Sequence, residues 1–421
     1  MNLLVLSINY APEPTGFAPH TTALCEYLAS QRHAVTVMTG FPFAPYWARY
    51  PAYRGKFIER KRLNGVDVIR LTHFMPRVPG KMSQRLLMEG TFCALAAVNA
   101  LLQFRSSYEA ILYVGAQPSM AMLARMIARF HRIPYFVKIT DLAAQAATDV
   151  GIVKSPTLKK FLSHFEYAAY RHASGAIVLC NAFREALISH GYPSERIRII
   201  RDSVNLDLIR PVSNGDAFRR EHGLSSDDFV VLYSGSMGIK QGLTNVVEAA
   251  RFLKDGHPMI KWVLVGDGEL KPTLQKLVAE YELFEQVRLL PLQAENKMSA
   301  MFSCADLLLL NQLREVKDTV IPSKLLTYMA SGQAVLAAVN SSSQAAALLR
   351  EAQGGVIVKP QDPSALALAI KQLQANRSAL PEMGQRNRKY AEKHFDRRQI
   401  VRAQEAFLIK IVNQTHYSSV K

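Results

Sequence analysis

The sequence has few of the features that mark secreted, metal-stabilised or nucleotide-hydrolysing proteins. Its 421 residues include only four cysteines, with no CxxC pair and no Cys/His metal spacing. Each cysteine lies in an apolar run, which favours buried, reduced thiols over disulfides or zinc. The sequence has no Asp-x-Asp metal motif and no Walker A ending. Gly and Pro occur at ordinary levels, which excludes collagen-like and low-complexity chains.

Long apolar runs are also scarce. The first residues form a short apolar run without a basic segment before it, and the run ends at Pro12 and Pro14. This pattern predicts a first strand rather than a signal peptide. The stretch 86–104 is long enough to resemble a membrane span, but it contains Glu89 and Asn99. A buried helix is therefore favoured, and a helix lying on a membrane surface is the second interpretation.

The charge is strongly positive. Lys and Arg number 51 against 34 Asp and Glu, a net charge of +17, which indicates an anionic partner: nucleic acid, an acidic membrane or a phosphorylated molecule. Residues 1–210 carry 25 basic and 13 acidic side chains, so most of the excess lies in the first half. Nine basic residues fall between Arg54 and Arg85, just before the apolar stretch. This segment is either a solvated basic face or a docking surface for anionic lipid.

Short apolar runs alternate with amphipathic stretches along the whole chain. Strands are expected at 2–8, 34–39, 66–71, 110–114, 134–139, 175–180, 197–200, 229–234, 261–265, 286–290, 305–310, 334–339 and 354–358. Helices are expected at 118–131, 157–172, 242–254, 269–282, 363–375, 382–394 and 399–413. This alternation predicts an α/β protein with parallel sheets covered on both faces. Two such sets predict two doubly wound, Rossmann-like domains.

The alternation is interrupted near residues 202–215, where a domain boundary is expected. We expect a first domain over residues 1–205 and a second over residues 206–395. The remaining residues, 396–421, are expected to form a helix that packs back on the first domain.

Four loops follow predicted strands, at the edge where doubly wound sheets bind their ligands. The loop Asn9–Phe17 contains Gly16, which would let backbone approach a ligand at a helix amino terminus. An ordinary Pro/Gly loop is its equally weighted alternative. The loop Ser234–Gly242 has two glycines before Lys240 and one after it, which fits a phosphate cradle with a lysine counter-charge. An ordinary turn with a solvated lysine is the alternative. The loop Val265–Leu270 is explained by a tight turn alone.

The fourth loop, Val320–Leu326, opens a helix that ends at Ser331-Gly332. Proline in the first turn and glycine past the end are typical helix boundaries. The backbone amides near Ser323 and Lys324 would form an anion site, and the charge of Lys324 would strengthen it.

Together these loops resemble those of the GT4 family of retaining nucleotide-sugar glycosyltransferases, which have the GT-B fold. The resemblance covers essentially the whole chain. It is carried by residues 28–39, Tyr233-Ser234-Gly235, residues 240–243, residues 263–268, Pro322-Ser323-Lys324-Leu325 and residues 329–335. The segments SGSMGIKQGL and PSK are most similar to the branch that contains the colanic-acid fucosyltransferases of exopolysaccharide synthesis. The resemblance implies two facing Rossmann-like domains.

The resemblance also implies roles for individual residues. Lys240, within the loop of Gly235, Ser236 and Gly238, would hold the donor diphosphate, aided by the amides of Ser323 and Lys324. Gly266, in the family-like segment 263–268, would also belong to the donor-binding site. The backbone from Leu290 to Leu292 would hold the base. Gly16 would close over the donor phosphates from the first domain. Asp141, at a strand end, matches the polar position on the acceptor side; a helix cap is its equally weighted alternative.

The sequence departs from the family at several positions. Ser236 replaces the arginine that partners the phosphate lysine. The paired glutamates fall near Thr319 and Thr327, with Asp318 as a candidate substitute. Arg32 replaces the glycine that ends the first helix.

The implied reaction is a retaining, metal-independent transfer from a nucleoside-diphosphate sugar, with no other cofactor required. A GDP-sugar such as GDP-fucose is favoured, and a UDP-sugar is close behind. The expected acceptor is a lipid-diphosphate-linked glycan at the inner face of the cell membrane, which makes the protein cytoplasmic and peripheral. A non-hydrolysing nucleotide-sugar epimerase of the same fold is an alternative. Nucleic-acid binding is less favoured, because no basic stripe with clustered aromatics occurs.

Overall fold

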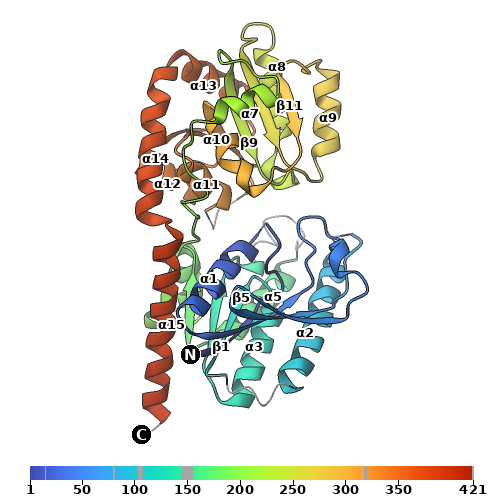
Figure 1. Ribbon diagram of the computed structural model, residues 1–421, viewed down its shortest axis with the longest axis vertical. Helices are drawn as coiled ribbons and strands as arrows, with labels where there is room; N and C mark the ends of the chain where they lie inside the picture. Colours follow the sequence, from blue (N-terminus) through green and yellow to red (C-terminus); the bar gives the residue numbers. More distant parts are fainter. Residues whose placement is uncertain (15, 79–80, 103–107, 145–154, 317–320, 420–421) are drawn as a thin grey trace. The chain divides into compact units, whose positions relative to one another are not determined.

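The computed structural model of the chain describes residues 1–14, 16–78, 81–102, 108–144, 155–316 and 321–419 (Figure 1). The chain divides into two compact units. The first contains Met1–Asp202 together with Arg398–Lys421, and the second contains Ser203–Arg397. Each unit is an α/β layer structure around its own sheet, as the alternation of apolar and amphipathic segments predicts.

The sheet of the first unit has eight strands among the described residues, in the order β3-β4-β2-β1-β5-β6-β7-β8. The strands are β1 (Asn2–Leu6), β2 (Ala34–Gly40), β3 (Ile58–Leu63), β4 (Val66–Leu71), β5 (Ala110–Gly115), β6 (Tyr135–Ile139), β7 (Gly175–Val178) and β8 (Ile197–Ile199). All neighbouring strands are parallel except β3 and β4. Continuous apolar strands such as β5 are buried along their whole length, because helices cover both faces.

The edge strand β3, which was not among the predicted strands, corrects the expectation that both sheets are entirely parallel. β3 pairs antiparallel with β4, and Leu63 lies opposite Val66. The turn between them is Asn64-Gly65, and both residues have positive φ, 48° and 85°. Asparagine and glycine adopt this conformation readily, which is why Asn-Gly closes two-residue hairpins. The exposed side chains of Arg60, Lys61 and Arg62 therefore lie on an ordered edge strand.

Two groups of helices cover the sheet of the first unit. α1 (Ala18–Ser30) and α15 (Arg397–Ser419) pack on one face, where Leu24 and Leu28 meet Phe407 and Leu408 in a shared core. Figure 1 shows α15 beside α1, and Tyr27 donates to Glu405 across the two helices at 2.8 Å. Other helices of this unit among the described residues are α2 (Met82–Leu102), α3 (Pro118–His131), α5 (Pro156–Tyr170) and α6 (Asn181–Ser189). Among them, α3 contacts both α2 and α5.

The sheet of the second unit has six parallel strands among the described residues, in the order β11-β10-β9-β12-β13-β14. They are β9 (Phe229–Ser234), β10 (Ile260–Val265), β11 (Val287–Leu290), β12 (Leu307–Asn311), β13 (Ala334–Ala338) and β14 (Gly355–Val358). The order reverses between β9 and β12, which makes the carboxyl end of β9 the switch point where such sheets bind ligands.

Helices cover both faces of this sheet as well. On one face α8 (Thr244–Leu253), α9 (Lys271–Glu280) and α13 (Pro363–Ala375) contribute to one core. On the other face lie α7 (Gly215–Glu221), α10 (Met298–Ser303), α11 (Ser323–Ala330), α12 (Gln344–Ala352) and α14 (Leu380–His394). The short 3-10 helix η3 (Ile239–Gln241) precedes α8. The two doubly wound sheets confirm the predicted fold class.

The apolar stretch near residue 90 forms α2, and no helix of the described residues is long and apolar enough to cross a membrane. Asn99 is buried on α2 and accepts a 3.5 Å hydrogen bond from Arg60 of β3. None of the four cysteines forms a disulfide: Cys25, Cys180 and Cys304 are buried, and Cys93 is half-buried. Residues 103–104 of the predicted apolar stretch lie outside the described residues.

Candidate functional site

Two glycine-containing loops lie against each other at the carboxyl edge of the second unit's sheet. Gly235 follows β9 and Gly266 follows β10, with φ of 141° and 155°. A Cβ atom on Gly266 would overlap the carbonyl oxygen of Gly235, and one on Gly268 would lie 2.8 Å from the carbonyl carbon of Met237. Only glycine allows this approach of backbone to backbone. The glycines of the two predicted loops are therefore required for the loops to pack against each other.

This packing also determines which backbone amides remain for a ligand. The amide of Gly235 donates to the carbonyl of Val265 at 3.0 Å, and the amide of Met237 donates to that of Asp267 at 2.8 Å. The other two donors of the predicted cradle are the amides of Ser236 and Gly238, which follow Gly235 and Met237 respectively. Ser236 is exposed and Gly238 is half-buried. A phosphate at this loop would therefore meet alternate amides rather than a continuous run of them.

Lys240 lies on η3, and its side chain is exposed. The backbone around it is fixed by buried Asn311, the last residue of β12. The Nδ2 atom of Asn311 donates to the carbonyls of Gln241 and Gly242 at 2.7 and 3.0 Å, and the carbonyl of Lys240 accepts from the Leu313 amide at 2.9 Å. The lysine thus combines a fixed backbone with a side chain that can reach an anion.

The amino terminus of α11 lies at the same edge. Ser323 is its first residue and is exposed, and the preceding Pro322 provides no side-chain cap. The first amides of a helix have no intrahelical acceptor, so those of Ser323 and Lys324 suit an anion. The side chain of Thr327 donates back to the carbonyl of Ser323 at 3.2 Å. The structure therefore brings Lys240, the glycine loop and the α11 terminus to one edge of one sheet.

Lys324 does not extend freely into solvent. Its Nζ atom lies 2.5 Å from the hydroxyl oxygen of Tyr233 and 4.0 Å from the centroid of that ring. Burial lowers the pKa of Lys324 to about 7. A lysine amine with so little contact with water holds its proton weakly unless an anion stands beside it.

The predicted base-binding segment follows β11. The carbonyl of Leu290 already accepts from the Gly266 amide at 3.0 Å, and the carbonyl of Pro291 accepts from the Gln293 side chain at 2.9 Å. Leu292 is exposed, so its own backbone polar groups are the ones this segment can offer to a base. Asp318, the candidate substitute for a family glutamate, lies outside the described residues, as does Thr319.

In the first unit, Gly16 stands just before α1, is exposed and has a φ of 66°. The loop before it is organised by Glu13, which is buried. The carboxylate of Glu13 accepts from the amides of Phe43 and Ala44, both at 2.8 Å, and from the Asn9 side chain at 2.9 Å. Burial nevertheless raises the pKa of Glu13.

Asp141 follows β6 and its Oδ1 atom accepts from the amide of Leu142 at 2.9 Å. The next two amides, of Ala143 and Ala144, donate to the buried Glu166 of α5 at 2.8 and 3.1 Å. Burial raises the pKa of Glu166 to about 7 against the opposing effect of those two hydrogen bonds, and the nearby charge of Asp141 raises it further. A helix-capping side chain accepts from the second or third amide beyond it, and Glu166 takes those two amides here. The bond from Leu142 to Asp141 therefore does not by itself decide between the catalytic and capping interpretations.

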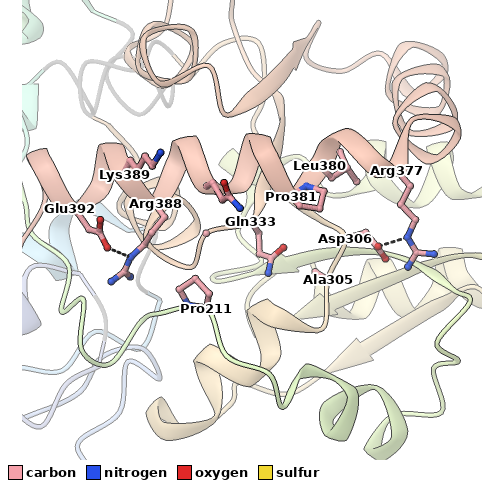
Figure 2. A pocket seen from close by; sticks show the side chains of 12 residues that line it. Pro211, Ala305, Asp306, Gln333, Arg377, Leu380, Pro381, Arg388, Lys389 and Glu392 are labelled. Carbon is pink, nitrogen blue, oxygen red and sulfur yellow. Dashed lines mark hydrogen bonds and ion pairs between the residues drawn. The ribbon is translucent and has the colours of Figure 1, made fainter.

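A cavity of about 640 Å³ lies at the opposite, amino-terminal edge of the second unit's sheet (Figure 2). Asp306 and Arg377 face each other in it at 2.7 Å, and Arg388 pairs with Glu392 at 2.7 Å. Asp306 also accepts from Arg219 at 2.9 Å, and Arg388 donates to the carbonyl of Ala330. Asp306, Arg377 and Arg388 are thus engaged in holding the unit together.

Several residues that build these sites were not predicted as site residues from the sequence. They are Tyr233, Asn311 and Tyr328 around the glycine loop, and Glu13 and Glu166 in the first unit. A polar residue at the end of an apolar strand was the available signal for Tyr233 and Asn311. Among the described residues, no group of three His, Cys, Asp or Glu side chains is arranged to hold a metal ion.

Comparison with known proteins adds family evidence to this geometry. Residues 15–202 match the "Glycosyl transferase 4-like domain" family, and residues 214–394 match "Glycosyl transferases group 1". The chain is 28% identical over 413 residues to the "Putative colanic acid biosynthesis glycosyl transferase WcaI" of Escherichia coli, covering 96% of this chain and 98% of that protein.

Solved structures show the same fold. Sucrose-phosphate synthase from Thermosynechococcus elongatus superimposes with a TM-score of 0.74 at 19% identity, covering 98% of this chain and all of that one. Anabaena Alr3699/HepE in complex with UDP gives a TM-score of 0.70 at 16% identity, covering 97% of this chain and all of that one.

Proposed function

Because the chain belongs to the group 1 glycosyltransferases with a GT-B fold, we propose that it transfers a sugar from a nucleoside-diphosphate donor, with retention of configuration and without a metal ion. One observation carries the proposal. The exposed Lys240, the alternate amides of the glycine loop and the uncapped amino terminus of α11 lie at the carboxyl edge of a single sheet. This edge is where a doubly wound sheet binds a nucleotide.

The chemical requirement is to stabilise negative charge on the departing diphosphate. The backbone of Lys240 and the helix amides are held at this edge by the fold, so they need little reorganisation during the reaction. Lys324 adds a second positive charge when its amine is protonated. Ser236, where the family has arginine, offers a hydroxyl and an amide, so the lysines carry the positive charge of the site.

The substitution Lys240→Ala tests this role. Removing one group that stabilises a developing charge typically lowers turnover about 100- to 1000-fold. We expect that loss with an unchanged melting temperature, because the side chain is exposed on η3. Lys276→Ala, on the exposed surface of α9, is the matched control. Transfer at the wild-type rate by Lys240→Ala would reject the assignment.

We assign the donor to the GDP-sugars, with GDP-fucose first and a UDP-sugar second. The full-length similarity to a colanic acid biosynthesis glycosyl transferase supports an exopolysaccharide role. A UDP-sugar is the competing donor, because Anabaena Alr3699/HepE, which has the same fold, was solved in complex with UDP. A thermal-shift comparison of GDP with UDP separates them, because the bound nucleotide raises the melting temperature by mass action. A larger shift with UDP would exclude the GDP assignment.

Asp141 is the proposed catalytic group on the acceptor side. Asp141→Asn keeps an oxygen that can accept from the Leu142 amide but removes the charge. A large loss of transfer with an unchanged melting temperature is expected if the carboxylate acts on the acceptor. Unchanged transfer would leave Asp141 as a turn-capping residue.

The acceptor is proposed to be a lipid-diphosphate-linked glycan, reached from the inner face of the membrane. Of the 20 exposed large hydrophobic side chains among the described residues, 14 lie in the first unit. Those on α2, α3 and α5 are Leu86, Leu87, Val98, Met126, Phe130, Leu158, Phe161 and Phe165. The two carboxylates of these helices, Glu89 and Glu166, are bonded to Ser119 and to backbone amides. The described residues of these helices thus expose apolar side chains but no free carboxylate, and the same unit carries the basic strand β3. Both features suit binding to an anionic lipid surface.

Sedimentation with vesicles containing anionic lipid tests this surface. Replacing Arg60, Lys61 and Arg62 with glutamine should weaken binding by about 1 kcal/mol per charge, and added salt should reduce wild-type binding. Phe130→Ala and Phe161→Ala should weaken binding at every salt concentration. Phe252→Ala, equally exposed on α8 of the second unit, is the control. Binding that none of these variants changes would reject the docking surface.

A further inference from the structure

The hydroxyl group of Tyr233 lies between Lys324 and the glycine loop. It donates its single proton to the carbonyl of Ser236, at an oxygen–oxygen distance of 2.5 Å. The 2.5 Å contact with the Nζ atom of Lys324 must therefore use a lone pair of the tyrosine oxygen, with the lysine as donor. The direction of both hydrogen bonds is thus fixed: lysine to tyrosine, and tyrosine to the loop.

The surroundings leave the lysine little freedom. A Cβ atom at Gly235 would lie 3.1 Å from Nζ and 3.2 Å from Cε of Lys324, so the lysine passes directly beneath the loop at a position with no side chain. One turn further along α11, Tyr328 accepts from the Ser234 amide at 2.8 Å and donates to the Ser234 carbonyl at 3.2 Å. Lys324 and Tyr328 together tie α11 to the end of β9.

The amine of Lys324 has no acidic partner among the described residues. Among the described residues, the titratable group in contact with it is Tyr233 from β9, and burial raises the pKa of that hydroxyl. No charged side chain of the described parts of β12, β13 or α14, which also pack on α11, bonds to it. Burial without a counter-charge lowers the pKa of Lys324 to about 7. A diphosphate at the loop would supply the missing negative charge.

We infer that Tyr233 is a positioning residue that holds the Lys324 amine beneath the glycine loop, and that donor binding is coupled to uptake of a proton by this amine. The inference rests on the proposed function, because the diphosphate is taken to bind at this loop. The proton comes from solvent and converts the neutral amine into an ammonium ion. No other bond is made or broken.

Calorimetric titration with UDP and GDP at pH 8, in two buffers of different ionisation enthalpy, measures the uptake. Lys324→Met provides the baseline, because its proton uptake reports only the ionisation of the nucleotide itself. For the nucleotide that binds, the wild-type protein should take up close to one proton more than this variant. Equal uptake by the two proteins would overturn the coupling. If neither nucleotide binds the wild-type protein, the proposed function fails, and this inference fails with it.

The pH dependence of affinity tests the role of Tyr233. Wild-type affinity should fall about tenfold per pH unit once the pH exceeds the pKa of the free lysine, since one proton is then bound with the ligand. Tyr233→Phe removes the accepting lone pair and should move the onset of this fall to lower pH. Tyr328→Phe, which alters the same strand end without a bond to Lys324, should leave the onset in place. If Tyr233→Phe binds the nucleotide more weakly but its affinity begins to fall at the same pH as that of the wild-type protein, Tyr233 has only a structural role.

Discussion

Gly266 and Gly235 meet backbone to backbone, so closely that a single methyl group on Gly266 would overlap the carbonyl oxygen of Gly235. The two residues end neighbouring parallel strands, and the loop that carries the proposed phosphate site is seated on this contact. The shape of the site therefore depends on this contact between the two loops.

Gly266→Ala should destabilise the second unit and impair donor binding. The substitution places a Cβ at a φ of 155° and against a backbone atom, and strained backbone of this kind costs about 1–3 kcal/mol. We expect a melting temperature lower by several degrees and a smaller stabilisation by nucleotide. Gly256→Ala is the control, because a Cβ there meets no atom within 4 Å. Equal melting temperatures for the two variants would contradict the packing argument.

Glu166 should make the first unit more stable at acidic than at alkaline pH. Its pKa is raised from the ordinary carboxyl value to about 7, so folding favours the protonated form. The stabilisation is complete below the unfolded pKa and is lost as the pH rises through about 7. Glu166→Gln cannot ionise and keeps one accepting oxygen for the turn.

Melting temperatures at pH 5 and pH 8 measure this effect. The melting temperature of the wild-type protein should exceed that of Glu166→Gln by more degrees at pH 5 than at pH 8. A margin that is constant, or larger at pH 8, would show that the carboxylate is held in its charged form.

Asn311→Ala should loosen the backbone that carries Lys240. The variant leaves the carbonyls of Gln241 and Gly242 without their donor, and an unsatisfied buried polar group costs about 1–3 kcal/mol. Nucleotide affinity should fall although the side chain of Lys240 itself is unchanged. Asn340→Ala is the comparison, because Asn340 bonds only within its own turn in the described structure. Nucleotide affinity equal to that of the wild-type protein would remove Asn311 from the site.

Asp306 should contribute more to stability than any exposed carboxylate. It binds Arg219, Arg377 and the Val230 amide at 2.7 to 2.9 Å, and its side chain is only 11% exposed. Breaking a buried ion pair by removing one partner costs about 3–5 kcal/mol, whereas exposed pairs contribute at most about 1 kcal/mol. Asp306→Ala should therefore melt well below Glu221→Ala, which removes the exposed pair with Lys297. Similar melting temperatures would contradict this difference.

Much of the fold follows from local patterns in the sequence. The strands at 66–71 and 229–234 and the helices at 118–131 and 363–375 have the predicted bounds, because continuous apolar runs and amphipathic periods are local signals. β3 was missed, since an exposed strand rich in charge has the composition of a surface loop and is identified only by its pairing with β4. Arg32, at the family's glycine position, adopts a φ of 64°, so the backbone keeps its conformation although the residue differs.

The loops of the site could be predicted from the sequence, but the contacts that support them could not. Gly235, Gly266 and Lys240 stand in recognisable motifs, and the structure places them at one edge of the sheet. The contact of Tyr233 with Lys324 joins residues 91 positions apart, and the bond from Asn311 to Gln241 joins residues 70 positions apart. Such pairs depend on how β9, β12 and α11 are arranged in space, which no local pattern specifies.

The most direct test of the account is equilibrium binding of UDP and GDP to the wild-type protein, to Lys240→Ala and to Lys276→Ala. The account predicts that one nucleotide binds the wild-type protein and Lys276→Ala alike. Lys240→Ala should bind it at least tenfold more weakly, a difference of about 1.4 kcal/mol, with no change in the melting temperature of the free protein. Equal affinities for Lys240→Ala and Lys276→Ala would contradict the central claim that this edge of the sheet holds the donor diphosphate.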